Sequence, residues 1–225
     1  MKMQYAGYGK FITEYINQVN PGVPIYTTDM VKEVVERFNT EEPQARKVVN
    51  VTLKRLADGN DVADLQRFEK GIYYKPKKTA FGVSLLNPLQ IVIDNYVKKA
   101  DEEFGYETGP SFLNRLGLTT QIPKYRYFAT NKCDRYGDNL NEKLKVILRK
   151  PAATVTKYNR AYLQILDAVQ NRDKTPIDVI DFSERLTTFI ENNNLDYRKI
   201  IVYAQKYYGR EVILRLAELA VSMGL

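Results

Sequence analysis

The sequence contains no histidine and a single cysteine among its 225 residues. Without histidine the chain cannot form Ser-His or Cys-His nucleophile pairs, and it lacks the side chain that most often acts as a general base near neutral pH. The lone Cys133 cannot form an intramolecular disulfide, and a zinc site would have to rest on that thiol and on carboxylates. These absences argue against an enzyme and against a structural metal.

Long apolar runs and nucleotide-binding loops are also missing. No segment approaches the roughly 18 apolar residues of a membrane span, and the start, "MKMQYAGYGKFITEY", lacks the apolar stretch of a signal peptide. The phosphate-binding pattern G-x-x-x-x-G-K-[ST] and the dinucleotide pattern G-x-G-x-x-G do not occur, and no closely spaced carboxylate pair stands out. We therefore expect a cytoplasmic protein with no membrane association and no cofactor.

Positive charge is present in excess, and it is concentrated. The chain carries 34 Lys and Arg against 27 Asp and Glu, a net charge of +7. Residues 44–56 and 70–82 each hold four bases and no acid; removing these eight bases leaves 26 against 27 acids. Charge runs are ordinarily solvated faces, but two such segments close together in one small module favour an anionic partner.

The first eighty residues predict three helices followed by a hairpin. Apolar residues at helical spacing in "GKFITEYINQV" predict a first helix that ends at "NPG", and Thr27 or Thr28 is expected to cap a second helix, "DMVKEVVERF". A third helix is expected at about 43–58, closed by Gly59. "VADLQRF" and "IYYKP", joined by "EKG", are expected to be two short strands. This order is that of a winged helix-turn-helix.

The predicted third helix has an apolar face and an opposite basic face when its residues are placed at 100° intervals. Lys47, Asn50 and Lys54 gather on the basic face, with Arg46 and Asp58 at its edges. The apolar face is expected to hold Ala45, Val48, Val49, Thr52, Leu53 and Leu56.

In a winged helix-turn-helix the third helix enters the major groove and the hairpin lies against the DNA backbone. Asn50 is the residue with a marked base preference, because an amide can pair bidentately with adenine. The hairpin lysines would contact phosphates without reading sequence. Phe68, Ile72 and one of Tyr73 or Tyr74 are expected to pack on the helices, which leaves at most one tyrosine hydroxyl for a phosphate. The candidate DNA-binding residues are Gln44, Arg46, Lys47, Asn50, Lys54, Arg55, Lys70, Tyr73, Lys75, Lys77 and Lys78.

Residues 84–151 predict a small α+β segment. "NPLQIVIDNYVKKA" is expected to be a helix with Pro88 in its first turn, "SFLNRLG" a short helix, and "YRYFATN" a strand that could pair with "KLKVILRK" at 144–150. The glycines around these elements could mark a ligand loop, but they accompany no catalytic constellation, so a structural role is favoured.

Residues 152–225 predict a wholly helical region. In "TKYNRAYLQILDAVQN" the residues Tyr158, Tyr162, Ile165, Leu166 and Val169 share one face. The next helix is expected to begin at Thr175 and Pro176, and two more, "DYRKIIVYAQKYY" and "REVILRLAELAVSM", are expected to follow, ending at Gly209 and Gly224.

The predicted fold class is thus α+β and mainly helical, with two domains. Residues 1–83 are expected to form the winged helix-turn-helix, and residues 84–225 a C-terminal domain made of the α+β segment at 84–151 and the helical region at 152–225. On physical grounds this second domain is an interaction or scaffold domain.

The run "LKRLADGNDVADLQRFEKGIYYKPKKTAFG", followed by "GYETGPSFLNRLGLTTQIP", resembles the AbiEi-like antitoxins of bacterial type IV toxin-antitoxin (abortive infection) systems, which act in phage defence. The match is good for residues 44–123 and loose over the last seventy; "KGIYYKP" and "LGLTTQIP" carry most of its specificity. The resemblance implies a repressor that binds repeats in its own promoter. It also implies an adjacent nucleotidyltransferase-like toxin, counteracted without a stable complex.

Two alternatives to a DNA-binding antitoxin stay open. The basic faces could bind an acidic protein partner, which would make the chain a protein-interaction module. A nucleic-acid enzyme that uses the region from "GYETG" to "LGLTTQ" is less favoured, because no catalytic residues gather there in the sequence. We therefore expect a transcriptional autorepressor that is not an enzyme, with double-stranded DNA as its partner.

Overall fold

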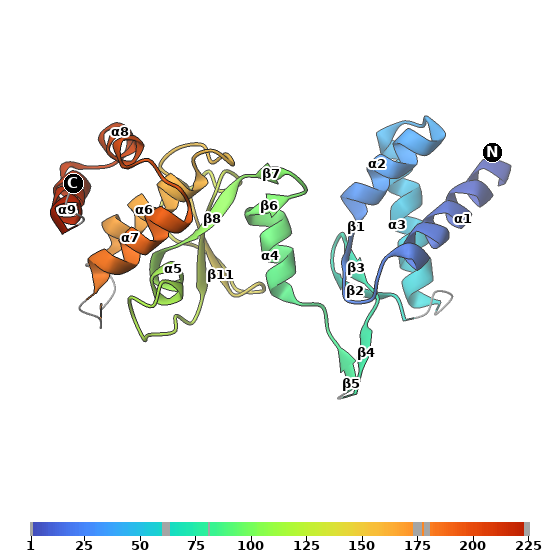
Figure 1. Cartoon of the computed structure of the whole chain (residues 1–225). Coiled ribbons are helices and arrows are strands. Elements are labelled where there is room, and N and C mark those ends of the chain that lie inside the picture. Colours follow the sequence, from blue (N-terminus) through green and yellow to red (C-terminus); the bar gives the residue numbers. More distant parts are fainter. Residues whose placement is uncertain (1, 60–63, 81, 173–176, 178–180, 223–225) are drawn as a thin grey trace. The chain divides into compact units, whose positions relative to one another are not determined.

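The computed structural model describes residues 2–59, 64–80, 82–172, 177 and 181–222. The chain divides into two compact units, residues 1–90 and 91–225 (Figure 1). The described residues combine helices with small sheets, which confirms the predicted α+β class. The expected boundary at residue 83 falls inside a short strand, β5 (Gly82–Ser84), whereas the units divide after Gln90.

The first unit contains the three expected helices. They are α1 (Lys2–Gln18), α2 (Thr27–Phe38) and α3 (Glu42–Asp58). The expected cap on α2 is wrong, because Tyr26 occupies the N-cap position without a side-chain hydrogen bond and Thr27 is already the first helical residue. The backbone N–H of Thr27 donates instead to the carbonyl of Gly71 at 2.9 Å, so the hairpin turn satisfies a donor that a side-chain cap would otherwise serve.

The hairpin is present, but it belongs to a three-stranded sheet. Its strands are β2 (Gln66–Glu69) and β3 (Ile72–Tyr74), joined by a turn in which Gly71 has a φ of 85°. The strand β1 (Pro24–Tyr26), which the sequence did not predict, pairs antiparallel with β3 and makes β3 the central strand. The predicted strand "VADLQRF" begins only at Gln66, and residues 62 and 63 lie outside the described residues.

A second hairpin follows immediately and was also not predicted. Strand β4 (Lys77–Thr79) pairs antiparallel with β5, and the two form a separate two-stranded sheet. The Lys-Pro-Lys-Lys run therefore does not simply leave the first hairpin: Lys77 and Lys78 lie on a strand of their own.

The core of the first unit lies between its helices and β3. All six residues expected on the apolar face of α3 are buried, which confirms that face. They pack with Ile12 and Ile16 of α1 and with Met30 and Val34 of α2, and the ring of Tyr8 meets that of Phe38 edge-on at 4.6 Å.

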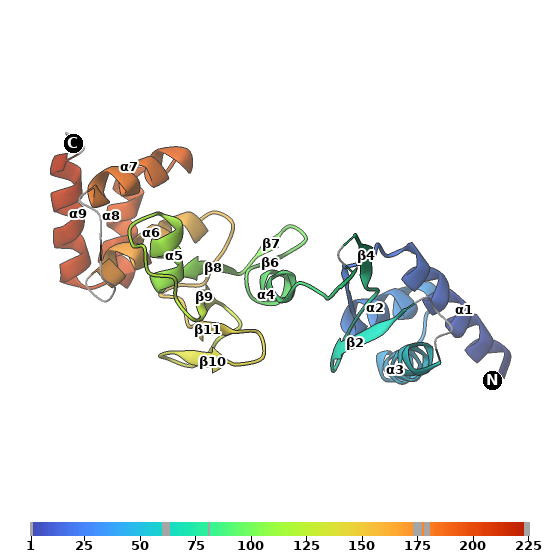
Figure 2. The same cartoon turned by 90° about the horizontal axis from the view of Figure 1, so that it is seen from below.

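The second unit is built on a four-stranded sheet of order β10-β11-β9-β8, whose strands are visible side by side in Figure 2. The predicted pairing of β9 with β11 is confirmed and is parallel, while the other two pairings are antiparallel. Strands β8 and β10 were not predicted. The bounds are β8 (Gly105–Thr108), β9 (Arg126–Thr130), β10 (Asn139–Asn141) and β11 (Val146–Arg149).

Two helices and a small hairpin accompany this sheet. They are α4 (Pro88–Tyr96), the strands β6 (Lys98–Lys99) and β7 (Glu102–Glu103), and α5 (Gly109–Arg115). Pro88 stands at the start of α4 as expected, and the side-chain oxygen of Asn87 accepts the N–H of Leu89 at 3.0 Å. The end of α4 is tied to β8, since the N–H of Gly105 donates to the carbonyl of Val97 at 3.0 Å.

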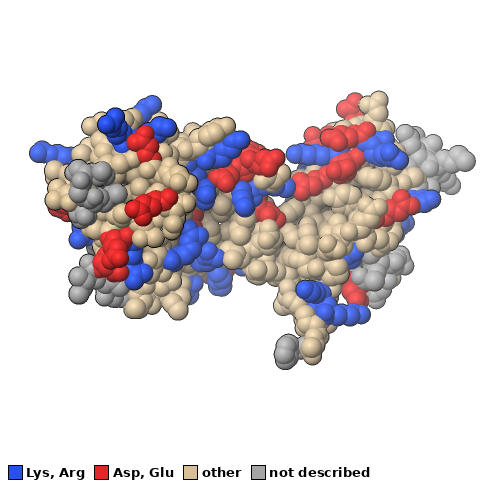
Figure 3. Space-filling model, viewed as in Figure 1, with Lys and Arg blue, Asp and Glu red and all other residues tan. Residues whose placement is uncertain are grey.

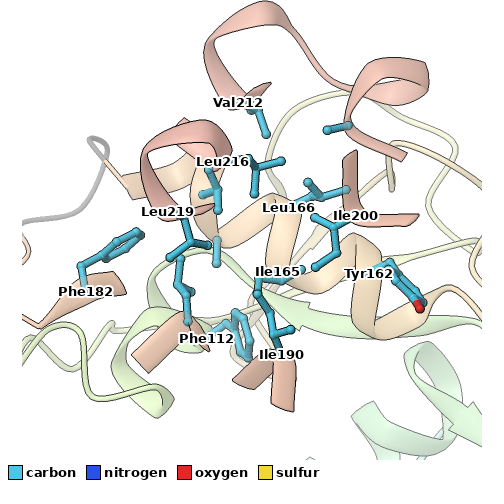
Figure 4. Packing of buried hydrophobic residues seen from close by; sticks show 14 of the residues in the cluster. Phe112, Tyr162, Ile165, Leu166, Phe182, Ile190, Ile200, Val212, Leu216 and Leu219 are labelled. Atoms are coloured by element: carbon cyan, nitrogen blue, oxygen red, sulfur yellow. The ribbon is translucent and has the colours of Figure 1, made fainter. Parts of the chain in front are cut away.

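Within the part of the second unit that the structure describes, four further helices follow, and α6 is at the centre of their core (Figure 4). Ile165 and Leu166 of α6 are fully buried among Phe112 of α5, Ile200 of α8 and Leu216 of α9. The helices are α6 (Arg160–Asn171), α7 (Phe182–Asn192), α8 (Tyr197–Tyr207) and α9 (Arg210–Ser222).

Two details of the expected helical region need correction. Tyr158 lies before α6 and is 78% exposed, so it is not part of the apolar face that Tyr162, Ile165, Leu166 and Val169 form. The expected start at Thr175 and Pro176 lies outside the described residues, and α7 begins at Phe182. Within the described ranges, no helix combines the length and apolar character needed to cross a bilayer.

Candidate functional site

The outer face of α3 carries the residues expected to contact DNA. Lys47, Asn50 and Lys54 are all exposed, on the side opposite the buried residues of the helix. None of the three forms a hydrogen bond or ion pair with another residue of the described chain. The predicted separation of a core face from a basic face in α3 is confirmed, and its polar groups are available to a ligand.

Val51 lies within this basic face and was not among the expected site residues. Its side chain is 63% exposed, four positions after Lys47 and three before Lys54. Residues three or four apart are neighbours on a helix surface, so the periodicity that identified the lysines also places Val51 between them. An exposed aliphatic side chain among cations is suited to contact an apolar group of a polar ligand.

The margins of the α3 face are less strongly basic than expected. Gln44 and Arg55 are exposed. Arg46, however, donates to the carboxylate of Glu42 one turn earlier, with Nη2 and Oε1 2.5 Å apart. This ion pair offsets the charge of Arg46 at the start of the helix.

Among the predicted DNA-binding residues, Tyr73 has a side chain that is buried and therefore inaccessible to a ligand. Its side chain is only 5% exposed and packs in the core with Ile25 and Leu65, so the prediction that it contacts DNA is wrong. Tyr74 is also buried, and its hydroxyl donates to the side chain of Gln66 at 2.7 Å. All three residues of β3 are buried, so both faces of this strand are covered.

The four lysines of the hairpin region fall into different settings. Lys70 is exposed in the turn between β2 and β3, and Lys77 is exposed on β4. Lys75 donates to the carbonyl of Asn17 in the last turn of α1 at 3.0 Å, and Lys78 lies 3.5 Å from the carboxylate of Asp64. On the face drawn in Figure 3, Lys and Arg atoms gather over the β4–β5 hairpin.

The second unit contains a polar cluster that the sequence did not indicate. The carboxylate of Asp167 on α6 accepts hydrogen bonds from the hydroxyls of Tyr106 at 3.0 Å, Thr108 at 2.8 Å and Tyr208 at 2.7 Å. Burial raises the pKa of Asp167 from its ordinary value, although the three hydroxyl donors act in the opposite direction. Because the four residues come from three separate segments of the sequence, the cluster fastens β8 to α6 and to the end of α8.

The tyrosines of this cluster give an expected dependence of stability on alkaline pH. Burial, followed by the charge of Asp167, raises the pKa of both Tyr106 and Tyr208 well above 10. A tyrosine whose pKa is raised by folding stabilises the protein below pH 10, and that stability is lost as the pH rises above 10 towards the folded-state pKa. Each tyrosine should lower the free energy of unfolding by about 1 kcal/mol per pH unit there.

Urea unfolding between pH 9 and 11 measures this effect. The variant Tyr208→Phe should show a shallower fall in unfolding free energy than the wild type, whereas Tyr158→Phe, at a side chain that is 78% exposed, should follow the wild type. Identical curves for Tyr208→Phe and wild type would contradict the assignment.

A second cluster joins acidic and basic side chains across the same sheet. Glu107 on β8 is 5% exposed; its Oε1 accepts both Nε (2.9 Å) and Nη2 (2.7 Å) of Arg126, and its Oε2 lies 2.9 Å from Nη1 of Arg115. Arg160 Nε lies 2.7 Å from the carboxylate of Glu103. Through Glu107, the segment "GYETG" thus holds the guanidinium groups of Arg115 and Arg126 in place.

Among the described residues, no three Cys, Asp or Glu side chains lie close enough together to hold a metal ion. Cys133 is 8% exposed, and its Sγ lies 3.5 Å from the carbonyl oxygen of Arg135. The same sulfur also accepts from Nδ2 of Asn139 at 3.5 Å, so the thiol takes part in the hydrogen bonds of the loop after β9.

Comparison with known families identifies the chain. A model described as a family of unknown function, DUF6088, matches residues 12–174, well over half of the sequence. The chain belongs to the DUF6088 family. The DUF6088 match includes the exposed face of α3, both hairpins of the first unit and the ionic cluster around Glu107. Among curated proteins, none matches the chain.

Proposed function

We propose that this DUF6088 chain is a DNA-binding transcriptional autorepressor whose first unit is a winged helix-turn-helix. The observation that carries the proposal is the outer face of α3, where Lys47, Asn50 and Lys54 are exposed opposite a fully packed core face. Further support comes from the order of three helices and a hairpin, and from Lys70 at the tip of that hairpin. In this proposal α3 enters the major groove, and the β2–β3 hairpin contacts the adjacent backbone.

The composition of the α3 face suggests how it would read DNA. Asn50 can pair bidentately with adenine, and the methyl groups of Val51 can contact the C5-methyl of thymine on a neighbouring base pair. Lys47 and Lys54 would contact guanine or flanking phosphates. We therefore propose that A·T pairs occupy the centre of the half-site.

The antitoxin role rests on the resemblance to AbiEi-like proteins. In this proposal the chain binds repeats in its own promoter, in the cytoplasm, and counteracts a nucleotidyltransferase-like toxin without a stable complex. The chain itself performs no catalysis. The helices α6 to α9 then serve the antitoxin activity.

Salt dependence is the test of the DNA-binding proposal. Five cations, Lys47, Lys54, Arg55, Lys70 and Lys77, are exposed and have no ionic partner in the described chain. If they neutralise about five phosphates, log K should fall with a slope near −4.5 against log salt, so a fourfold rise in salt should weaken binding roughly 500-fold. Fluorescence anisotropy with DNA from immediately upstream of the gene measures this slope.

A flat salt response would refute the proposal. In that case co-purification with the product of the neighbouring gene, after nuclease treatment, would favour the alternative in which the basic faces bind an acidic protein partner. A nucleotidyltransferase encoded next to this gene would support the antitoxin role.

A further inference from the structure

A small cavity in the second unit brings together an unusual number of charged side chains. Its volume is about 180 Å³, several times the space that one water molecule requires. The cavity is lined by side chains from the region of α4 and the β6–β7 hairpin, from β8 and β9, and from α5 and α6. The charged residues that line it are Lys98, Glu103, Glu107, Arg115, Arg126 and Arg160.

Two carboxylates hold the three arginines in position. Glu107 is bound by Arg126 through two nitrogens and lies within 2.9 Å of Arg115, so one buried carboxylate orders guanidiniums from two different elements. Glu103 likewise holds Arg160. These contacts occupy only some of the five N–H donors of each guanidinium, and the remaining donors have no acceptor in the described chain.

The charged side chains that line the cavity do not balance one another. Four cations face two carboxylates, which leaves an excess of two positive charges. Burial lowers the pKa of Arg115, and the neighbouring guanidiniums of Arg126 and Arg160 lower it further, against the raising effect of Glu107. Grouping like charges in this way is unfavourable, and a doubly charged anion between them would relieve it.

Part of the cavity lining is apolar. Ile93, Val97 and Phe128 contribute to it, and the guanidinium of Arg126 lies over the Phe128 ring at 5.4 Å from its centroid. Ligand sites usually combine such an apolar surface with a few fixed polar groups. A ligand that matches both the charged and the apolar lining residues has an anionic group and a carbon-containing body.

We propose that this cavity binds a small phosphomonoester, with its phosphate between Arg115, Arg126 and Arg160 and its organic part against Ile93, Val97 and Phe128. A phosphate dianion carries the charge that the wall lacks, and guanidinium groups match its oxygens bidentately. All the lining residues belong to the second unit, so the site is independent of the proposed DNA interface.

Isothermal titration calorimetry on the full chain at constant ionic strength tests the proposal. The probes are ribose 5-phosphate and adenosine 5′-monophosphate, with ribose and adenosine as their uncharged counterparts and inorganic phosphate as the anion alone. We expect both phosphomonoesters to bind saturably, inorganic phosphate to bind more weakly, and ribose and adenosine not to bind. Arg160→Gln should weaken binding at least tenfold, since it removes a charged hydrogen-bond donor.

The matched control is Arg198→Gln, an exposed arginine at the start of α8 that does not line the cavity. It should bind the probes as the wild type does. Arg115→Gln provides a second cavity variant, and circular dichroism melting of each variant verifies folding. The proposal is overturned if the wild type binds none of the phosphomonoesters, if adenosine binds as tightly as its monophosphate, or if folded cavity variants bind like the wild type.

Discussion

The double variant Lys47→Glu/Lys54→Glu is expected to bind the upstream DNA about 1000-fold more weakly than the wild type in roughly 0.1 M salt. Each lysine that neutralises a phosphate releases a counterion, which contributes about tenfold to affinity at this salt concentration. Replacement by glutamate removes the contact and adds repulsion. The core face of α3 is unchanged, because both side chains are exposed and make no contact with it.

A matched control for this variant exists on another helix. Lys199 and Lys206 are exposed on α8 of the second unit at the same seven-residue spacing, so Lys199→Glu/Lys206→Glu makes the same change in net charge at residues that are not part of the proposed interface. Gel-shift titrations of the three proteins at one salt concentration measure the difference. An equal loss in both double variants would assign the effect to net charge and contradict a specific role for α3.

The two faces of α3 could be predicted because they depend on local information. Successive residues of a helix are rotated by 100°, so the spacing of the sequence predicts which residues share a face. It predicts both the burial of Val48, Val49 and Leu53 and the exposure of Lys47 and Lys54. No knowledge of the rest of the fold is required. The same reasoning places Val51 on the outer face.

The error at Tyr73 has a non-local origin. Its strand, β3, was expected to pair only with the preceding strand of the hairpin. In the structure Pro24–Tyr26 pairs with its other edge, and Ile72, Tyr73 and Tyr74 are all buried, so both faces of β3 are covered. Three residues are too few for a detectable alternation, so neither β1 nor the burial of both faces of β3 could be inferred from the sequence.

The polar clusters around Asp167 and Glu107 in the second unit could not be predicted from the sequence, because they too depend on non-local contacts. Asp167 meets Tyr106 and Thr108 across 61 and 59 positions of sequence and Tyr208 across 41. Glu107 meets Arg126 across 19. Each residue alone has an ordinary sequence context, and only the order of the strands β8, β9 and β11 and the packing of α6 bring them together.

Gly105 lies where the backbones of α4 and β9 approach β8 closely. The variant Gly105→Ala is expected to lower the free energy of unfolding of the second unit by about 4 kcal/mol. A Cβ atom there would overlap the carbonyl oxygen of Tyr96 at the end of α4 and would lie 2.8 Å from the carbonyl oxygen of Ala129 on β9. Both are backbone atoms, so no side-chain rotation relieves the clash. The hydrogen bond from Gly105 to the carbonyl of Val97 should be lost as α4 moves.

Urea unfolding followed by circular dichroism measures the loss, which should also lower Tm by about 10 °C. Hydrogen exchange should locate the loosened backbone in residues 91–130 and leave residues 7–58 protected as in the wild type. The control is Gly209→Ala, before α9, where an added Cβ has no atom within 4 Å; its cost should stay below about 1 kcal/mol. If Gly105→Ala is as stable as Gly209→Ala, the prediction is contradicted. The end of α4 would then lie farther from β8 than the short distance from position 105 to the Tyr96 carbonyl implies.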